Sequence, residues 1–369
     1  MPTNIQTKWP GVYVEELPGL SLSVNSGATA VPVFIGAFSG APSGLTRLNS
    51  WLDVQDQVSD SGAEGEGAGT ALKPVLRGYF ENGGGYCYVA STVDSSLAGT
   101  LEQVNALDDV TMLIAPGLWD QGAEAAREWA YALIAYADEH QAMAILHTDQ
   151  GQTPAQARET LDDWKIDSDH AVMYYPWLIP TGGEAAVPPS GVLAGIWGRV
   201  DRERGVWRAP ANVAVRGVAS LEWEVSDSEQ GALGNINPLR SYSDTGILVW
   251  GARTLRDTDS WRYIPVRRLF NAAERDIQRA MRFAVFEPNT PPTWERVRSA
   301  VDNYLYNLWT SGALLGNTPE EAYFVQVGKG ITMTDQDIAQ NKLILKFGLA
   351  AVRPAEFIIA QLTIIVGEG

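Results

Sequence analysis

The chain has 369 residues, of which 45% are hydrophobic and 19% charged, a composition that suits a folded protein with a sizeable core. One cysteine, Cys87, excludes a disulfide within this chain and a thiolate metal cluster. The net charge of −17 is concentrated in residues 101–184, which hold 15 acidic and 3 basic side chains. This balance excludes nucleic acid as the main partner, because phosphate binding needs clustered Lys and Arg. We interpret the acidic segment as a solvated outer surface.

The length of the chain predicts more than one domain. We divide it into an N-terminal arm at 1–20, an α/β domain at 21–260 with its acidic outer part around 101–184, a smaller α+β domain at 261–354 and a C-terminal arm at 355–369. The first ten residues lack the apolar stretch of a signal peptide, and no apolar run reaches 18 residues. The sequence therefore predicts assembly in the cytoplasm without direct membrane insertion.

The N-terminal arm contains a short strand-like segment, residues 10–19, between two proline-glycine turns. Its alternating side chains Val12, Tyr13 and Val14 have no neighbouring hairpin partner in the sequence. A strand of this kind has to pair with something remote, so we predict that these three residues contact another subunit.

Short apolar runs alternate with helical patterns from residue 31 to about 252, which predicts an α/β layer with a mostly parallel sheet. In chain order the expected elements are a strand at 31–36, a glycine-rich loop at 61–70, a helix at 71–82, a strand at 86–91, a helix at 97–107, a strand at 111–115, a helix at 121–140, a strand at 143–147, a helix at 154–164, and strands at 171–175 and 246–250.

Catalytic and ligand-binding motifs do not emerge from this region. His140, His147 and His170 are not at metal-ligand spacing, and we expect structural or surface roles for them. The chain contains no GxxxxGK[ST] loop for a nucleotide and no GxSxG nucleophile turn. The sequence therefore predicts no catalytic residue, no cofactor-binding residue and no metal ligand, and it predicts that the protein is not an enzyme.

The smaller domain begins with two long amphipathic helices, at 266–286 and 292–312, on either side of a proline-rich turn. At 100° per residue, one face of the first helix collects four arginines. These candidates for contact with a partner are Arg268, Arg275, Arg279 and Arg282. The alternatives are a solvated basic face and a docking face for an acidic surface, which arginine side chains suit well. Strands are expected at 321–327 and 342–351.

The C-terminal arm ends in an apolar, β-branched run from residue 357 to 366. A strand that is apolar on both faces must be buried, or it becomes a template for aggregation. It is either an interior strand of the chain's own sheet or a strand shared with a neighbour. We favour the second interpretation, in which the contacts come from Phe357, Ile359, Leu362, Ile364 and Val366.

Several blocks of this sequence resemble contractile tail sheath proteins of phages and of phage-tail-like injection particles. The blocks occur in the same order along the chain, and the region at 37–230 resembles the family only in its α/β pattern. They are PGVYVEE at 10–16, VPVFIG at 31–36, GNINPLR at 234–240, GILVWGARTL at 246–255, WRYIPVRRLF at 261–270 and FEPN at 286–289.

The resemblance implies a structural, self-assembling protein. Sheath subunits of this family form six-membered rings stacked helically around an inner tube, and their terminal arms add strands to the sheets of adjacent subunits. Contraction then drives the tube through a target envelope without a nucleotide or any other cofactor. The partners implied are further copies of the chain, the inner tube protein, the baseplate and the terminator or cap proteins. The arginine face of the smaller domain is expected to face the tube.

Two alternatives remain open at this level. The chain is either a main sheath subunit or a paralogue restricted to the cap or the baseplate, and a soluble α/β enzyme that uses the carboxyl edge of its sheet is the less favoured candidate. The short chain is similar to the sheaths of extracellular injection particles, and a phage tail is the other possible location after cytoplasmic assembly.

Overall fold

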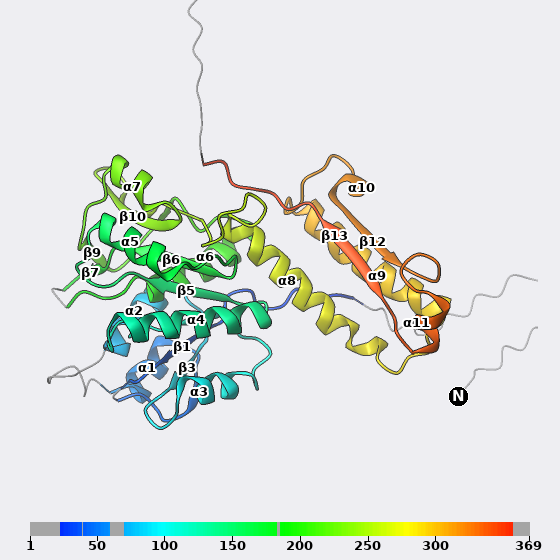
Figure 1. The fold of residues 1–369 in the computed structure, drawn as a ribbon, viewed down its shortest axis with the longest axis horizontal. Helices are drawn as coiled ribbons and strands as arrows, with labels where there is room; N and C mark the ends of the chain where they lie inside the picture. Colours follow the sequence, from blue (N-terminus) through cyan, green and yellow to red (C-terminus); the bar gives the residue numbers. More distant parts are fainter. Residues whose placement is uncertain (1–22, 39, 60–69, 183–184, 357–369) are drawn as a thin grey trace, which may run out of the picture.

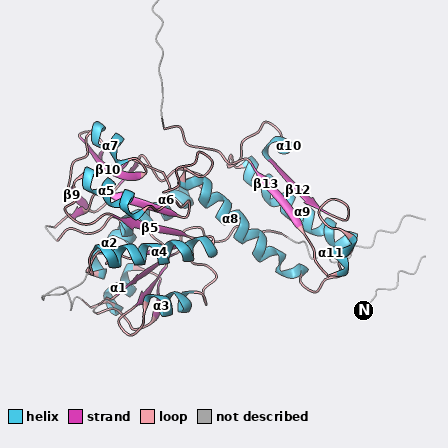
Figure 2. Ribbon diagram, viewed as in Figure 1, coloured by secondary structure: helices cyan, strands magenta, loops and turns pink. Residues whose placement is uncertain are grey.

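A computed structural model describes residues 23–38, 40–59, 70–182 and 185–356, and it has two parts (Figure 1). The first, which we call the α/β unit, is a large sheet with helices on both faces. The second, the small unit, begins with a long helix and ends in a two-stranded sheet, as the colours of Figure 2 make clear. The predicted arm strands, with all eight arm residues named above, lie outside the described residues, as does most of the predicted 61–70 loop.

The sheet of the α/β unit has nine strands in the order β2-β3-β1-β4-β5-β6-β10-β11-β8. The strands from β3 to β10 in this order are parallel to one another, whereas β2, β11 and β8 pair antiparallel at the two edges. The predicted mostly parallel sheet is therefore confirmed. The strands are β1 (Pro32–Gly36), β2 (Leu45–Leu48), β3 (Cys87–Ser91), β4 (Met112–Ile114), β5 (Met143–His147), β6 (Ala171–Tyr175), β8 (Val213–Ala214), β10 (Ile236–Tyr242) and β11 (Gly246–Val249).

Helices cover both faces of this sheet, so its central strands are buried on both sides. Along β1, Phe34 enters one core while Val33 and Ile35 enter the other, as the alternation of side chains in a strand requires. One face is covered by α1 (Trp51–Gln57), α2 (Leu72–Glu81) and α6 (Ser190–Arg204). The opposite face is covered by α3 (Leu97–Val104), α4 (Ala123–Glu139), α5 (Pro154–Trp164) and α7 (Asp227–Leu233). A separate pair, β7 (Leu178–Pro180) and β9 (Val218–Leu221), lies beyond β6 in sequence.

Helix α6 was not among the predicted elements, because it shows little amphipathic pattern. Its residues from Ser190 to Val200 are all buried, so no polar face marks its period. Glycines allow it to lie very close to α2: a Cβ atom on Gly195 would lie 2.2 Å from the carbonyl oxygen of Tyr79. The contact is with backbone, which cannot move aside as a flexible side chain would.

Replacing Gly195 by alanine should therefore lower the free energy of unfolding by about 1–3 kcal/mol, the usual result of overpacking a core. Urea unfolding measures the change. The matched control is Gly231→Ala in α7, where a Cβ atom would meet nothing within 4 Å and where alanine should add about 0.5–1 kcal/mol. Equal effects of the two substitutions would show that the close approach of α6 to α2 carries no cost.

The small unit follows the predicted order of two helices and two strands. Its elements are α8 (Ile264–Met281), the 3-10 helix η1 (Arg282–Ala284), α9 (Pro291–Thr310), α10 (Pro319–Ala322), β12 (Tyr323–Val327), α11 (Asp335–Ala339) and β13 (Leu345–Leu349). Its core joins α8 and α9 through side chains such as Ile277, Val301 and Leu305. The strands begin later than predicted, since the short helix α10 occupies the start of the first one and the chain turns through α11 before the second.

The described residues contain no candidate membrane span and no candidate metal-ion site. None of their helices combines the length and the apolar character that a bilayer crossing requires. Among the same residues, no group of three or more His, Cys, Asp or Glu side chains is arranged to hold a metal ion.

Candidate assembly site between the two units

The N-terminal segment reaches the large sheet by crossing α8, where a buried ion pair holds it. Arg268 of α8 donates to both carboxylate oxygens of Asp201, at 2.9 and 2.6 Å, and both side chains are at most 5% exposed. Thr29 takes part from both of its polar groups: its hydroxyl donates to Asp201 at 2.5 Å, and its carbonyl accepts from Arg268 at 3.0 Å. The segment is thus fixed to α6 and α8 at the same point.

A second buried carboxylate holds the same segment two residues earlier. Asp276 of α8 accepts a hydrogen bond from the backbone N–H of Gly27 at 2.9 Å and another from the Tyr304 hydroxyl of α9, also at 2.9 Å. Burial raises the pKa of this carboxyl group, and the two hydrogen bonds oppose that rise. Asp276 therefore ties the entering chain to both long helices of the small unit.

Each of the four arginines in the predicted partner-facing stripe makes a contact with the chain's own α/β unit. Arg268 binds Asp201; Arg275 donates to the Val110 carbonyl at 3.4 Å, and burial lowers its pKa to about 10. Arg279 and Arg282 reach the Asp108 carbonyl and carboxylate, at 3.5 and 3.1 Å. Arg268 is buried within the subunit, whereas Arg279 and Arg282 keep exposed side chains. A helical wheel does not show which tertiary contacts cover each side chain, so contact of this face with a partner stays a prediction.

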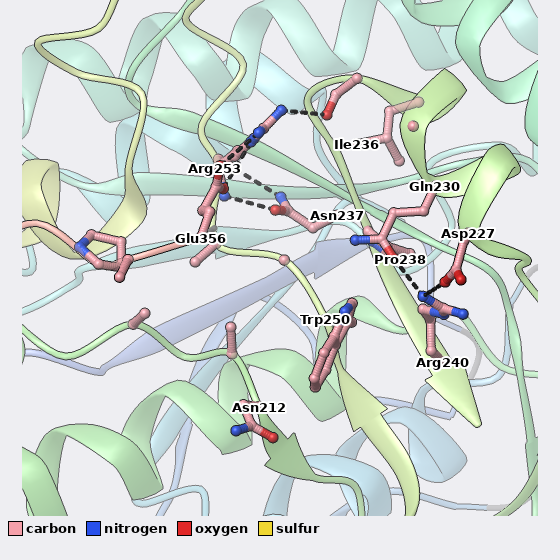
Figure 3. Close-up of a pocket in the computed structure, with 18 residues that line it drawn as sticks. Asn212, Asp227, Gln230, Ile236, Asn237, Pro238, Arg240, Trp250, Arg253 and Glu356 are labelled. Carbon is pink, nitrogen blue, oxygen red and sulfur yellow. Dashed lines mark hydrogen bonds and ion pairs between the residues drawn. The ribbon is translucent and has the colours of Figure 1, made fainter. Parts of the chain in front are cut away.

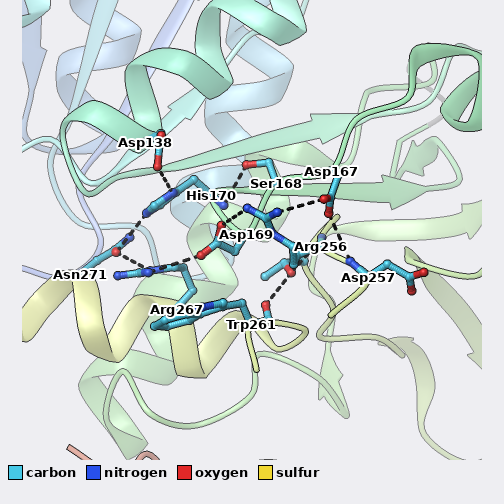
Figure 4. Close-up of polar contacts among 11 residues, drawn as sticks. Asp138, Asp167, Ser168, Asp169, His170, Arg256, Asp257, Trp261, Arg267 and Asn271 are labelled. Carbon is cyan, nitrogen blue, oxygen red and sulfur yellow. Dashed lines mark hydrogen bonds and ion pairs between the residues drawn. The ribbon is translucent and has the colours of Figure 1, made fainter. Parts of the chain in front are cut away.

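Close to the start of α8, a polar network joins it to the loop before β6 (Figure 4). Asp169 accepts from Arg256 at 3.1 Å and from Arg267 at 3.4 Å, and Arg267 also donates to the Asn271 amide oxygen at 2.8 Å. Although burial alone would raise it, the pKa of Asp169 is lowered by the hydrogen bond from Arg256 and by the nearby positive charges. This network fixes the first turns of α8 against the sheet.

The three histidines have structural positions. His140 ends α4, and His170 lies between Asp138, 2.9 Å from Nδ1, and Asn271, 3.3 Å from Nε2 (Figure 4). Burial and the Arg267 charge lower the pKa of His170. His147, at the end of β5, is completely buried, and burial lowers its pKa to about 3.

His147 should make the fold sensitive to acid. Its pKa is about 3 in the folded chain and about 6.5 in an unfolded one, so below pH 6.5 the unfolded state gains a proton that the folded state does not. Stability should therefore fall by about 2 kcal/mol between pH 6.5 and 5 on account of this residue. Urea unfolding of wild type and His147→Asn at both pH values measures how much His147 contributes to this loss of stability. Parallel losses in the two proteins would contradict it.

The C-terminal segment leaves the small unit and is bound again by the α/β unit (Figure 3). Arg253 donates to both oxygens of Glu356, from Nε at 2.9 Å and from Nη2 at 2.6 Å. Residues 354–356 form part of the wall of a groove of about 770 Å³, whose other lining residues include Trp250, Pro238 and Arg240. Both described ends of the chain are thus held by carboxylate contacts between the units.

The small sheet has unpaired edges. β12 pairs antiparallel with β13 over five residue pairs, and within the described chain neither strand joins a third one. Only an isolated bridge between Leu314 and Ala351 lies beyond the end of β13. Inner-face side chains such as Phe347 and Leu349 are only partly buried against α9 and its neighbours. Such edges can accept further strands.

Two domains of one known protein family match adjoining parts of the chain. The phage tail sheath protein central domain matches residues 100–255, and the phage tail sheath C-terminal domain matches residues 256–365. The chain belongs to the phage tail sheath family. This family is structural rather than enzymatic.

Sheaths of two contractile particles are similar along nearly the whole chain. A cryo-EM structure of the PVC sheath complex of an extracellular contractile injection system, in its contracted state, is 44% identical with a TM-score of 0.83 and covers 98% of each chain. The contracted helical sheath of the anti-feeding prophage is 41% identical with a TM-score of 0.81, covering 97% of this chain and 99% of the other.

Curated relatives are more distant and longer. The tail sheath protein of Vibrio phage KVP40 is 26% identical over 174 residues, which are 44% of this chain and 26% of that protein. The chain spans less than half the length of the curated tail sheath proteins that it matches.

The carboxyl edge of the parallel sheet, where an α/β enzyme would bind its ligand, is filled in this sheath protein by its own side chains. Phe38 follows β1 and Leu118 follows β4, and both are buried. Asp120 accepts hydrogen bonds at 2.8 Å from both the N–H and the hydroxyl of Thr70. The less favoured prediction of a soluble enzyme is set aside because the chain belongs to a structural family.

Sequence reasoning missed the residues that connect the two units of the sheath chain. Asp276 and Asn271 lie inside a helix that the sequence predicts and Asp201 lies in α6, which it does not predict, and none of the three was singled out. Their partners are far away in sequence, 172 residues for Thr29 and Asp201 and 249 residues for Gly27 and Asp276. The one available signal was an ionisable residue on an otherwise apolar helix face, which indicates a buried partner.

Proposed function

We propose that this chain is the structural subunit of a contractile sheath. It polymerises as stacked six-membered rings around an inner tube and contracts to drive that tube through a target envelope. One observation carries this proposal: the 44% identity to the contracted PVC sheath over 98% of both chains. A likeness of that extent covers the α/β unit, the small unit and the junction between them.

The terminal arms, residues 1–20 and 355–369, are proposed to complete sheets of neighbouring subunits. The unpaired edges of β12 and β13 are suitable acceptors, because each offers backbone N–H and C=O groups along five residues. The arm residues Val12, Tyr13 and Val14 at one end, and Phe357, Ile359, Leu362, Ile364 and Val366 at the other, would pack their side chains on the partly buried inner face. The contacts of Gly27, Thr29 and Glu356 would transmit load from the arms into the subunit.

The two units are proposed to face opposite directions in the particle. The small unit, residues 261–354, would lie against the tube, and the α/β unit would lie outside. Exposed carboxylates on α4 and α5, including Glu124, Glu128 and Glu159, support an outward position for the acidic segment, since they would keep a large particle soluble.

Arg279 and Arg282 are the arginines of the predicted stripe that keep exposed side chains, at 42% and 69%. If they contact the tube, the double variant Arg279→Glu/Arg282→Glu should weaken assembly on preformed tubes about tenfold or more while leaving the subunit folded, since each reversal replaces attraction by repulsion. Sedimentation of sheath with tubes measures this. Unchanged binding would show that these two side chains are solvated and do not contact the tube.

The remaining partners follow from the same proposal. They are the baseplate and a terminator or cap protein, with assembly in the bacterial cytoplasm before the particle is released or becomes a virion tail. No cofactor is required, since contraction would use energy stored in a metastable extended form at assembly. A chain in the six-fold symmetrised anti-feeding prophage baseplate structure is also similar, with 41% identity and a TM-score of 0.81. That likeness favours, as a second candidate, a sheath paralogue restricted to the baseplate.

Electron microscopy of the purified chain tests the proposal. A main sheath subunit should form long hollow cylinders on its own or on added tubes. A baseplate-restricted paralogue should stop at one or two rings under the same conditions. Small particles of subunit size at every concentration, with and without tubes, would refute both candidates.

A further inference from the structure

The residues around Arg253 form a prearranged socket. The Asn237 side chain donates to the Arg253 carbonyl and accepts from its N–H, both at 2.7 Å, and this pair of bonds fixes the backbone. The guanidinium group donates from Nη1 to the Gly234 carbonyl at 3.2 Å. Gly251 permits this arrangement, since a Cβ atom there would lie 2.6 Å from the Asn237 amide oxygen. Arg253 is therefore held in position by groups other than Glu356.

Glu356, by contrast, lies on a segment that belongs to neither unit. The backbone of the preceding strand is tied to the small unit, where Val352 N–H donates to the Ala313 carbonyl at 3.2 Å. Four residues later, Glu356 is bound by Arg253 of the α/β unit. The C-terminal segment is therefore tied to the small unit through its backbone and to the α/β unit through the Arg253–Glu356 pair, which Figure 3 shows.

The Arg253–Glu356 ion pair is partly exposed to water, which suits a contact that can form and break. The side chains are 28% and 22% exposed, so water reaches them, and the geometry is bidentate. The hydrogen bond to Glu356 raises the pKa of Arg253. Burial acts to raise the pKa of Glu356, but the hydrogen bond and the charge of Arg253, the hydrogen bond from Tyr263 and the charge of Arg262 together outweigh it, and the net change is a decrease. Both groups are charged at neutral pH, and neither pays the full desolvation cost of a buried pair.

We propose that Arg253 is a positioning residue for subunit assembly: by clamping Glu356 it sets the point and the direction at which the C-terminal arm leaves the subunit. The clamp couples that direction to the relative orientation of the two units, because Arg253 belongs to the α/β unit, whereas the segment that carries Glu356 is tied to the small unit four residues earlier. This inference rests on the proposed role of the arm in joining a second copy of the chain. When the arm leaves the subunit in one fixed direction, less conformational entropy is lost as a neighbour binds it, and this favours assembly.

The test compares four variants in the full chain. Glu356→Gln and Arg253→Gln each break the clamp, and Arg253→Glu/Glu356→Arg reverses it. Arg77→Gln is the matched control, because Arg77 is also partly exposed and ion-paired, with Glu81, but both residues lie on α2, away from the arm and outside the junction (Figure 1). Each single clamp variant should raise the critical concentration for polymerisation about tenfold, and the reversed pair should be closer to wild type than either. The control should leave it unchanged.

Hydrogen exchange of dilute subunits provides a second readout that does not need polymerisation. Amides of residues 350–356 should exchange faster in Glu356→Gln than in wild type, with the α/β unit unaffected. Unchanged exchange there, or single variants that polymerise at the wild-type concentration, would overturn the clamp. A reversed pair worse than both single variants would also overturn it. A wild-type chain that never polymerises would instead refute the proposed function, while the exchange result would still decide on the clamp.

Discussion

Replacing Arg268 by methionine is expected to lower the free energy of unfolding by about 3–5 kcal/mol, the usual effect of removing one partner of a buried ion pair. Asp201 would be left at 5% exposure with the Thr29 hydroxyl as its remaining partner among the described contacts, and its charge would no longer be compensated. Methionine keeps the apolar stem of the side chain but removes the guanidinium group that lies 4.5 Å from the centre of the Trp197 ring, so most of the loss comes from the charge. Urea unfolding at pH 7 measures it.

Arg282→Met is the matched control for this prediction. The Arg282–Asp108 pair is 69% and 72% exposed, and solvent screens it, so the same substitution should change stability by at most about 1 kcal/mol. The double variant Arg268→Met/Asp201→Leu should recover part of the loss, because it removes both charges. Similar losses for Arg268→Met and Arg282→Met would mean that the buried pair does not hold the junction.

A chain that ends at Glu356 is expected to fold and remain monomeric at concentrations at which the full chain polymerises. It keeps the clamp residue Glu356 and every described contact, so its free energy of unfolding should stay within about 1 kcal/mol of the full chain. It lacks the segment proposed to pair with a neighbour, so the sheet edges of adjacent subunits stay open. Sedimentation and electron microscopy measure the loss of polymer.

A second variant separates the length of the arm from its chemistry. It keeps all 369 residues but replaces Phe357, Ile359 and Ile364 by serine. If the apolar side chains of the arm are what a neighbour binds, this variant should fail to polymerise as the shortened chain does. Cylinders formed by the shortened chain would refute the role of the C-terminal arm.

The fold was predictable wherever one strand or helix carries its own pattern. The run at 31–36 became β1, because a strand buried on both faces is a short continuous apolar run. The predicted helix at 121–140 became α4, whose buried alanines and Leu133 show the helical period. Helix α6 was missed since it is buried on nearly all sides and its glycines are helix-disfavouring residues. Strand β10 was missed as an element because Pro238 in its middle argues against a central strand.

The junction was predictable only in outline. The wheel of α8 placed four arginines on one face, yet whether that face meets solvent, a partner or the same chain depends on tertiary contacts. Asp201, Thr29 and Asp108 come from different elements and are brought to α8 by the fold as a whole. The same holds for Arg253 and Glu356, which are 103 residues apart. Ion pairs of this kind have no local signature, so sequence periodicity cannot reveal them.

Cryo-EM of the assembled polymer tests the central claim most directly, because it shows what lies along the open edges of β12 and β13. The account predicts that strands contributed by the terminal arms of adjacent subunits extend this small sheet, with backbone hydrogen bonds between chains. A polymer in which those edges are bare, or are covered only by residues of the same subunit, would contradict it.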